Sequence, residues 1–360
     1  MLTHSSLLTL DSVVWLCASF LLSALLTWVA LHYARRINLL DQPGQRRSHT
    51  QPTPRGGGVG IVLAVVAGLV ALAVLQHDAA IPSRLIFAIG AIAAVGWIDD
   101  HRPLPALVRI LVHLVAIAVW LWPLIAGAWG MQGADGGHRV QSFEVVALLV
   151  FVCLWSVNLH NFMDGIDGLL SVQVIFVLAV LGVLCLRDPN TPHGFQVLLW
   201  AAAIIGFLPF NFPHARIFMG DVGSGTLGLL VAVAAIWQFS TLGSAASSAL
   251  LAVSAFLTDA TCTLVSRLFS GRDWYQAHRE HLYQWMVRAG MTHRRVVAWY
   301  AGWNVLIVLP LIAWLNQAPG ATVSSIEAGA VLWLYIAAVI VWICGKRWCL
   351  HKVRNQPGHA

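Results

Sequence analysis

Long apolar stretches separated by short polar segments dominate the chain, and eleven of them approach the roughly 20 residues that an α-helix needs to span a bilayer. They cover Ser12–Ala34, Gly56–Gln76, Ser83–Trp97, Ala106–Gly127, Phe143–Val157, Val172–Leu186, Phe195–Pro209, Val222–Phe239, Ala246–Leu268, Val296–Trp314 and Ala328–Gly345. A helix satisfies its backbone hydrogen bonds internally, so this pattern predicts an all-α polytopic integral membrane protein with about eleven transmembrane helices. The polar segments are too short for a soluble domain, so residues 1–360 are predicted to form a single transmembrane catalytic domain.

Composition and charge fix the class and the expected orientation. The chain is 59% hydrophobic and 10% charged, whereas soluble domains carry about 25% charged residues. With the N-terminus periplasmic and the C-terminus cytoplasmic, 18 of the 21 Lys and Arg residues fall on the inner side, as the positive-inside rule requires. The predicted cytoplasmic loops are 35–55, 98–105, 158–171, 210–222 and 269–295. The net charge of +6 is therefore a topology signal, and no nucleic-acid partner is expected.

The segment NLHNFMDGIDGLL, from Asn158 to Leu170, places Asn158, Asn161, Asp164 and Asp167 at steps of three. If the helix continues, these side chains form one inclined stripe. Two carboxylates about one turn apart repel each other unless a cation lies between them, and Mg²⁺ prefers oxygen ligands completed by substrate phosphates. The alternative is a turn of Asn, Asp and Gly between two helices.

Four further polar clusters lie beside apolar stretches. Asp99 and Asp100 close the third stretch; adjacent helical positions point about 100° apart, so one is expected to face a metal or phosphate while the other caps a helix or pairs with Arg102 or Arg109. A simple polar turn before Pro103 is the alternative. Asp221 is expected to cap the following helix, to ligate a cation, or to do both.

The segment PTPRGGG offers a glycine-rich helix start, where Gly57 and the Arg55 guanidinium could bind a phosphate. A basic loop with a flexible turn is the alternative. His278 and His281 are three residues apart with Arg279 between them, so a short helix is expected to present a cationic face to the carboxylates. A zinc site is less favoured, because HExxH is absent.

All these clusters fall on the predicted cytoplasmic side. Glycines that admit phosphates, at least five acidic groups and nearby basic residues together indicate Mg²⁺-assisted chemistry on a phosphorylated cytosolic compound, with the membrane supplying the second substrate.

Five motifs in order, PTPRGGG, GWIDD, NLHNFMDGIDGLL, FMGDVGSG and HREHL, resemble the polyprenyl-phosphate N-acetylhexosamine-1-phosphate transferases of glycosyltransferase family 4. The resemblance runs from about Asp41 to His281. It implies a multi-pass protein of the cell inner membrane whose cytoplasmic site transfers a sugar 1-phosphate from a UDP-N-acetylhexosamine to undecaprenyl phosphate and releases UMP, with Mg²⁺ or alternatively Mn²⁺.

The resemblance also implies roles for individual residues. Asp221 and Asp164 would hold the metal, and Asp99, Asp100, Asp164 and His281 would be catalytic. The substrate would be bound by Arg55, Gly57, Asn158, Asn161, Asp167, Asn211, His278 and Arg279. His281 matches the first His of the family's H-x-H-H pattern, but Leu282, Tyr283 and Gln284 follow. The resulting HLYQ resembles the branch that initiates O-antigen or related surface glycans.

Two other functions remain open at this stage. A Mg²⁺-dependent intramembrane prenyltransferase also uses Asp-rich motifs, but usually in two DxxxD-like clusters. A transporter would place polar residues near the bilayer midplane and often has repeated halves. The sequence does not decide the sugar, the choice between direct attack and an aspartyl-phosphate intermediate, or whether the protein forms a homodimer.

Overall fold

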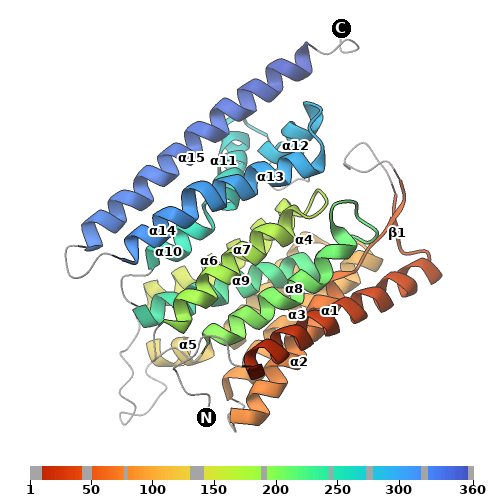
Figure 1. Ribbon diagram of the computed structural model, residues 1–360, viewed down its shortest axis with the longest axis vertical. Helices are drawn as coiled ribbons and strands as arrows, with labels where there is room; N and C mark the ends of the chain where they lie inside the picture. The colour runs from red at the N-terminus through yellow and green to blue at the C-terminus, as the bar shows by residue number, and fades with distance from the viewer. Residues whose placement is uncertain are drawn as a thin grey trace.

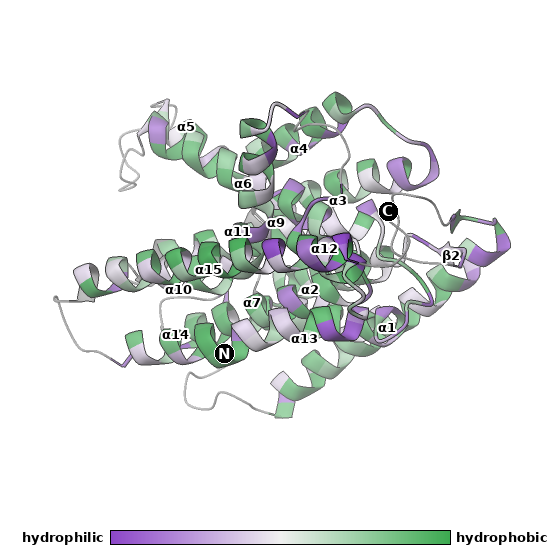
Figure 2. Cartoon of the chain, turned by 90° about the horizontal axis from the view of Figure 1, so that it is seen from above, coloured by the Kyte–Doolittle hydropathy of each residue, from purple (hydrophilic) through white to green (hydrophobic). Residues whose placement is uncertain are grey.

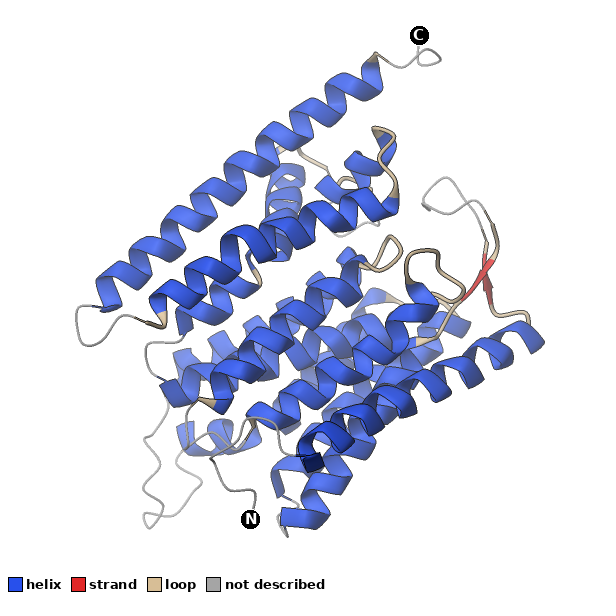
Figure 3. Ribbon diagram, viewed as in Figure 1, coloured by secondary structure: helices blue, strands red, loops and turns tan. Residues whose placement is uncertain are grey.

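The computed structural model describes residues 10–42, 51–76, 80–129, 142–187, 193–242, 246–272, 279–317 and 323–355. Helices dominate it (Figures 1 and 3). The first seven are α1 (Leu10–Arg36), α2 (Gly58–Gln76), α3 (Ala80–His101), α4 (Ala106–Trp120), α5 (Trp122–Ala128), α6 (Phe143–Met163) and α7 (Leu169–Leu186). They are followed by α8 (Gly194–Asn211), α9 (Asp221–Leu242), α10 (Ala246–Ala252), α11 (Ser254–Phe269), α12 (Leu282–Arg288), α13 (His293–Trp303), a π-helical turn η1 (Asn304–Val308), α14 (Leu309–Leu315) and α15 (Val323–Arg354). The strands β1 (Leu40–Asp41) and β2 (Thr53–Pro54) pair antiparallel.

The prediction of an all-α polytopic membrane protein is confirmed. Within the described residues, nine helical segments are long and apolar enough to cross a bilayer, and α4 with α5 makes a tenth if this pair, bent by 74°, counts as one span. The predicted ninth span, Ala246–Leu268, is instead split into α10 and α11.

Polar side chains accompany this break. Gln173 donates from Nε2 to the Ala252 carbonyl oxygen (3.2 Å) and accepts a hydrogen bond from Asn304 (2.6 Å). Trp303 donates to the Ser254 hydroxyl (3.1 Å). Backbone groups freed inside a bilayer must find partners within the protein, so these contacts explain how an interrupted helix is tolerated here.

Helix α9 forms the centre of the bundle. In its most apolar window 83% of the residues are buried, against 17% in α1 and in α15. Glycines allow its neighbours to approach closely, because Gly58 of α2 lies directly against the backbone of Gly223, and Gly96 of α3 lies against the backbone of Asp221. Seen from above, the helices present mostly hydrophobic residues, while hydrophilic ones gather at α12 and at helix ends (Figure 2).

The polar segments meet at one end of the bundle. Helices α3, α6 and α8 end there, and α2, α4, α7, α9 and α13 begin there (Figure 1). Helix α1 begins at the opposite end from the one where α15 ends, as expected for an odd number of crossings. Which end faces the cytoplasm stays a prediction from charge.

Candidate active site

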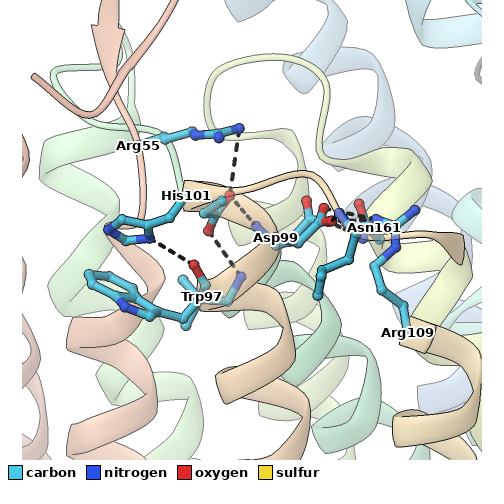
Figure 4. A network of polar contacts seen from close by, with 10 residues as sticks. Arg55, Trp97, Asp99, His101, Arg109 and Asn161 are labelled. Atoms are coloured by element: carbon cyan, nitrogen blue, oxygen red, sulfur yellow. Dashed lines mark hydrogen bonds and ion pairs between the residues drawn. The ribbon is translucent and has the colours of Figure 1, made fainter.

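A network of charged and polar groups joins the four helices α3, α4, α6 and α9 at this end (Figure 4). The Arg109 Nη1 atom donates to Asp99 Oδ2 (3.1 Å) and to Asp221 Oδ2 (2.9 Å), and Asn161 Nδ2 donates to the same Asp221 oxygen (3.2 Å). The backbone N–H of Leu104 donates to Asp99 Oδ1 (2.6 Å). Residues far apart in sequence therefore converge, with one guanidinium shared between two carboxylates.

Asp100 takes a different role from its neighbour Asp99. Its carboxylate is 2% exposed and accepts hydrogen bonds from the backbone N–H groups of Asp221 (3.1 Å) and Val222 (3.3 Å). These N–H groups open α9 and have no partner within the helix, so Asp100 caps it. Arg55 approaches from the other side, with Nη1 4.0 Å from Oδ1. The two adjacent acids therefore have different partners, since Asp100 caps the helix that carries Asp221 and Asp99 pairs with Arg109.

The predicted polar stripe is interrupted, because α6 ends at Met163 and the backbone of Asp164 leaves the helical conformation. Asn161 reaches Asp221 as described, whereas Asn158 donates back to the Leu154 carbonyl oxygen (2.7 Å) of its own helix. The expectation of one continuous stripe is therefore wrong. The helix thus ends before Asp167, and Gly168, with φ +76°, stands between Asp167 and the start of α7.

Asp164 lies at the junction after α6. Burial raises its pKa from the ordinary 3.8 to about 8, and the negative charges of Asp221, Asp100 and Asp167 add to this effect. A cation bound next to Asp164 would favour the ionised carboxylate, which burial and the neighbouring carboxylates disfavour. A raised pKa of this kind is common at functional sites.

Asp167 lines a separate polar pocket of about 700 Å³, together with Gln51, Thr53, His214, Phe218, Thr292, His293, Arg294 and Arg295 among others. Its Oδ2 atom lies 3.3 Å from His293 Nδ1 and accepts a hydrogen bond from the Ala215 N–H (3.2 Å). The start of α13 brings His293 to Asp167.

The PTPRGGG segment is used differently from the expected anion-binding turn. The N–H of Gly57 donates to the Phe218 carbonyl oxygen and that of Gly58 to the Met219 carbonyl oxygen, both at 2.9 Å. Both N–H groups therefore bond to the loop that precedes Asp221. The expected binding of a phosphate by the Gly57 N–H is wrong, because this donor already has a backbone partner. The Arg55 guanidinium lies near the Asp100 carboxylate, and a quarter of the Arg55 side chain is exposed.

The Asn211 side chain links two loops by hydrogen bonds. It is 4% exposed, its Oδ1 atom accepts from the Gly168 N–H (2.9 Å), and its Nδ2 atom donates to the Ile217 carbonyl oxygen (3.1 Å). Its side-chain contacts therefore connect the loop of Asp167 to the loop of Asp221 rather than lining the pocket.

The predicted cationic face of His278, Arg279 and His281 is not found as expected. His278 lies outside the described residues. His281 caps α12 and is 2% exposed, and burial lowers its pKa although the nearby Asp259 opposes this effect. A buried neutral imidazole is not a cationic face. Arg279 is half-buried near Arg288, and burial together with that like charge lowers its pKa.

Sequence reasoning missed Asp259, which the structure connects to His281 and to Tyr283. The available signal was a single carboxylate within the apolar stretch Ala246–Leu268, since an ionisable residue in a membrane segment is a candidate by default.

Comparison with known proteins places this geometry in a family. The sequence model described as "Glycosyl transferase family 4" matches residues 83–238, which hold Asp99, Asp100, Asn161, Asp164 and Asp221. The match to glycosyl transferase family 4 covers 156 of the 360 residues.

The chain is also similar along most of its length to curated relatives. It is 28% identical to decaprenyl-phosphate N-acetylglucosaminephosphotransferase of Mycolicibacterium smegmatis, over 89% of this chain and 87% of the relative. It is 27% identical to the probable undecaprenyl-phosphate N-acetylglucosaminyl 1-phosphate transferase of Bacillus subtilis, over 92% and 89%. It is 26% identical to the undecaprenyl-phosphate alpha-N-acetylglucosaminyl 1-phosphate transferase of Escherichia coli K12, over 78% and 77%.

Proposed function

We propose that this protein transfers an N-acetylhexosamine 1-phosphate, such as N-acetylglucosamine 1-phosphate, from its UDP-sugar to undecaprenyl phosphate and releases UMP. The observation that carries the proposal is the convergence of Asp99, Arg109, Asn161 and Asp221 at the polar end of a membrane bundle. The printed activities of the curated relatives support the same reaction.

The reaction is an in-line displacement at phosphorus. An oxygen of the lipid phosphate forms a bond to the β-phosphorus of the UDP-sugar, and the bond from that phosphorus to the bridging oxygen breaks, so the electron pair leaves with UMP. A phosphate monoester is largely ionised near pH 7, so no strong base is needed. Asp99, already engaged by Leu104 N–H and Arg109, is suited to positioning the nucleophile through Arg109 rather than to removing a proton.

We propose Mg²⁺, with Mn²⁺ as an alternative, as the ion of this site. Among the described residues no group of three or more His, Cys, Asp or Glu side chains could hold a metal by itself. Mg²⁺ is usually held by one or two carboxylates together with substrate phosphates, and Asp221 and Asp164 supply such carboxylates. Burial and, to a smaller extent, repulsion from nearby carboxylates raise the Asp164 pKa, which fits a cation there. Arg109 supplies one positive charge between Asp99 and Asp221. When bound, the ion would neutralise charge on the pyrophosphate.

The same proposal includes location and pathway class. The basic residues at the polar end favour a cytoplasmic site in the inner membrane, where a nucleotide sugar is available. The HLYQ sequence favours initiation of O-antigen or a related surface glycan. In the polar pocket, Asp167, His293 and Arg294 offer a hydrogen-bonding pair and a cation for the nucleotide of the donor.

The test is a reconstituted reaction. Purified protein, undecaprenyl phosphate and Mg²⁺ are supplied with a panel of UDP-sugars, and the lipid product is identified by mass while UMP is measured. Asp221→Asn is expected to reduce transfer at least a hundredfold while remaining folded in detergent. Release of pyrophosphate in place of UMP, or no lipid product from any UDP-sugar, would contradict the proposal, and full activity of Asp221→Asn would contradict the role of that residue.

A further inference from the structure

A second carboxylate cluster lies outside the network of Asp99 and Asp221. Asp259 of α11 is 2% exposed and accepts hydrogen bonds from several elements. Its Oδ1 atom accepts from Leu282 N–H (2.7 Å) and Trp342 Nε1 (3.0 Å), and its Oδ2 atom accepts from the Tyr300 hydroxyl (2.7 Å) and Tyr283 N–H (3.4 Å). One side chain therefore connects α11 to α12, α13 and α15.

Helix α12 depends on this connection. It has seven residues, and isolated helices of that length are unstable in water. The N–H groups of Leu282 and Tyr283 lie in its first turn and have no partner within the helix. Because both donate to Asp259, the position of α12 is set by α11 at its first turn.

Tyr283 links α12 to the end of α6 in the candidate active site. Its side chain is fully buried, and its hydroxyl donates to the Phe162 carbonyl oxygen (3.0 Å), one of the carbonyl groups left unpaired at the end of α6. Its ring also lies against Gly165, where an added Cβ would come within 2.9 Å of the ring carbon Cζ. Tyr283 thus contacts the backbone on both sides of Asp164, next to Asn161.

We propose that Asp259 is a positioning residue that acts through Tyr283: by holding the first turn of α12, it keeps the Phe162–Gly165 backbone, and with it Asn161 and Asp164, in place for the reaction. The inference rests on the proposed function for its kinetic consequence. Its structural part, the support of the end of α6, does not depend on what the enzyme transfers.

The test compares Tyr283→Phe and Asp259→Asn with a matched control, Tyr335→Phe. The Tyr335 hydroxyl also donates to a backbone carbonyl oxygen, that of Leu250 at 2.8 Å, but this bond joins α15 to α10 rather than α12 to α6. Two readouts are taken on the full-length protein in detergent. They are kcat and KM for the UDP-sugar, and amide hydrogen exchange of the segment 158–168.

Tyr283→Phe is expected to lower kcat roughly three- to tenfold, the scale of one lost hydrogen bond, with KM changed less than twofold and with faster exchange in 158–168. Tyr335→Phe is expected to leave both readouts unchanged. If Asp259 acts through Tyr283, the kcat of the double variant, Asp259→Asn with Tyr283→Phe, is no lower than that of the more impaired single variant. The effects of residues that act as one unit are not additive.

Three results would overturn the inference. The first is unchanged amide exchange in 158–168 for Tyr283→Phe, and the second is an unchanged kcat of that variant despite faster exchange. The third is a double variant whose loss of kcat equals the product of the two single losses. Should Asp259→Asn fail to fold, Tyr283→Phe alone decides, because it removes one oxygen and leaves the ring in place. If the wild-type protein transfers no sugar phosphate, the proposed function fails, and the exchange measurement still decides whether Tyr283 supports the end of α6.

Discussion

A single methyl group added to Gly96 tests whether the close approach of α3 and α9 sets the geometry of the site. In Gly96→Ala, the new Cβ would lie 2.5 Å from the carbonyl carbon and oxygen of Asp221 and 2.6 Å from the Val222 nitrogen. Non-bonded carbon atoms are in favourable contact at about 3.5–4.0 Å, so the two helices must separate by about 1 Å. The obstructing atoms are backbone atoms, which cannot rotate away.

This separation acts directly on the Asp99–Arg109–Asp221 network, because α3 carries Asp99 and α9 carries Asp221. The two contacts of Arg109, at 3.1 and 2.9 Å, cannot both be kept when the helices move apart. A misplacement of about 1 Å in an active site can lower the rate about a hundredfold, while overpacking costs roughly 1–3 kcal/mol of stability. Gly96→Ala is therefore expected to lower kcat/KM for sugar-phosphate transfer 30- to 100-fold, as an order of magnitude, with a modest loss of thermal stability.

Gly90→Ala is the matched control on the same helix, because a Cβ at that position meets no atom within 4 Å. Alanine favours a helix over glycine by about 1 kcal/mol, so this variant should keep its activity and be at least as stable as the wild type. Transfer kinetics and thermal unfolding in detergent are measured for both. If Gly96→Ala keeps more than half of the wild-type kcat/KM, the reasoning from close packing to site geometry is refuted.

Two further variants test the electrostatics of the site. Arg109→Ala leaves Asp99 and Asp221 without their shared cation, so its melting temperature should fall in Mg²⁺-free buffer and rise more on addition of Mg²⁺ than that of the wild type; an equal Mg²⁺ response in both proteins would count against a metal at Asp221. Asp164 has a pKa of about 8 in the folded protein against an ordinary 3.8. Between these values the folded protein keeps the carboxyl protonated while the unfolded chain has lost that proton. The free energy of unfolding should therefore fall as pH rises from about 4 to about 8. In Asp164→Asn, melting temperatures measured in Mg²⁺-free buffer across this range should depend less on pH, and an unchanged slope would show that Asp164 is not the titrating group.

The sequence by itself determined the class of the protein and the polar segments of the site. Apolar stretches of spanning length predict transmembrane helices because the bilayer leaves the backbone no other partner, and nearly all of them are found as helices. The adjacent pair Asp99 and Asp100 could be assigned two different jobs from sequence, because neighbouring positions on a helix point in different directions.

Tertiary structure alone decided which partner each polar group has. Asp100 rather than Asp99 caps α9, His293 meets Asp167, and the Gly57 N–H bonds to the loop before Asp221. The interruption between α10 and α11 depends on Gln173, about 80 residues away in the chain. Periodicity describes which way a side chain leaves its own helix. It carries no information about which other helix lies opposite, and hydrogen-bond geometry is satisfied or lost over a few tenths of an ångström.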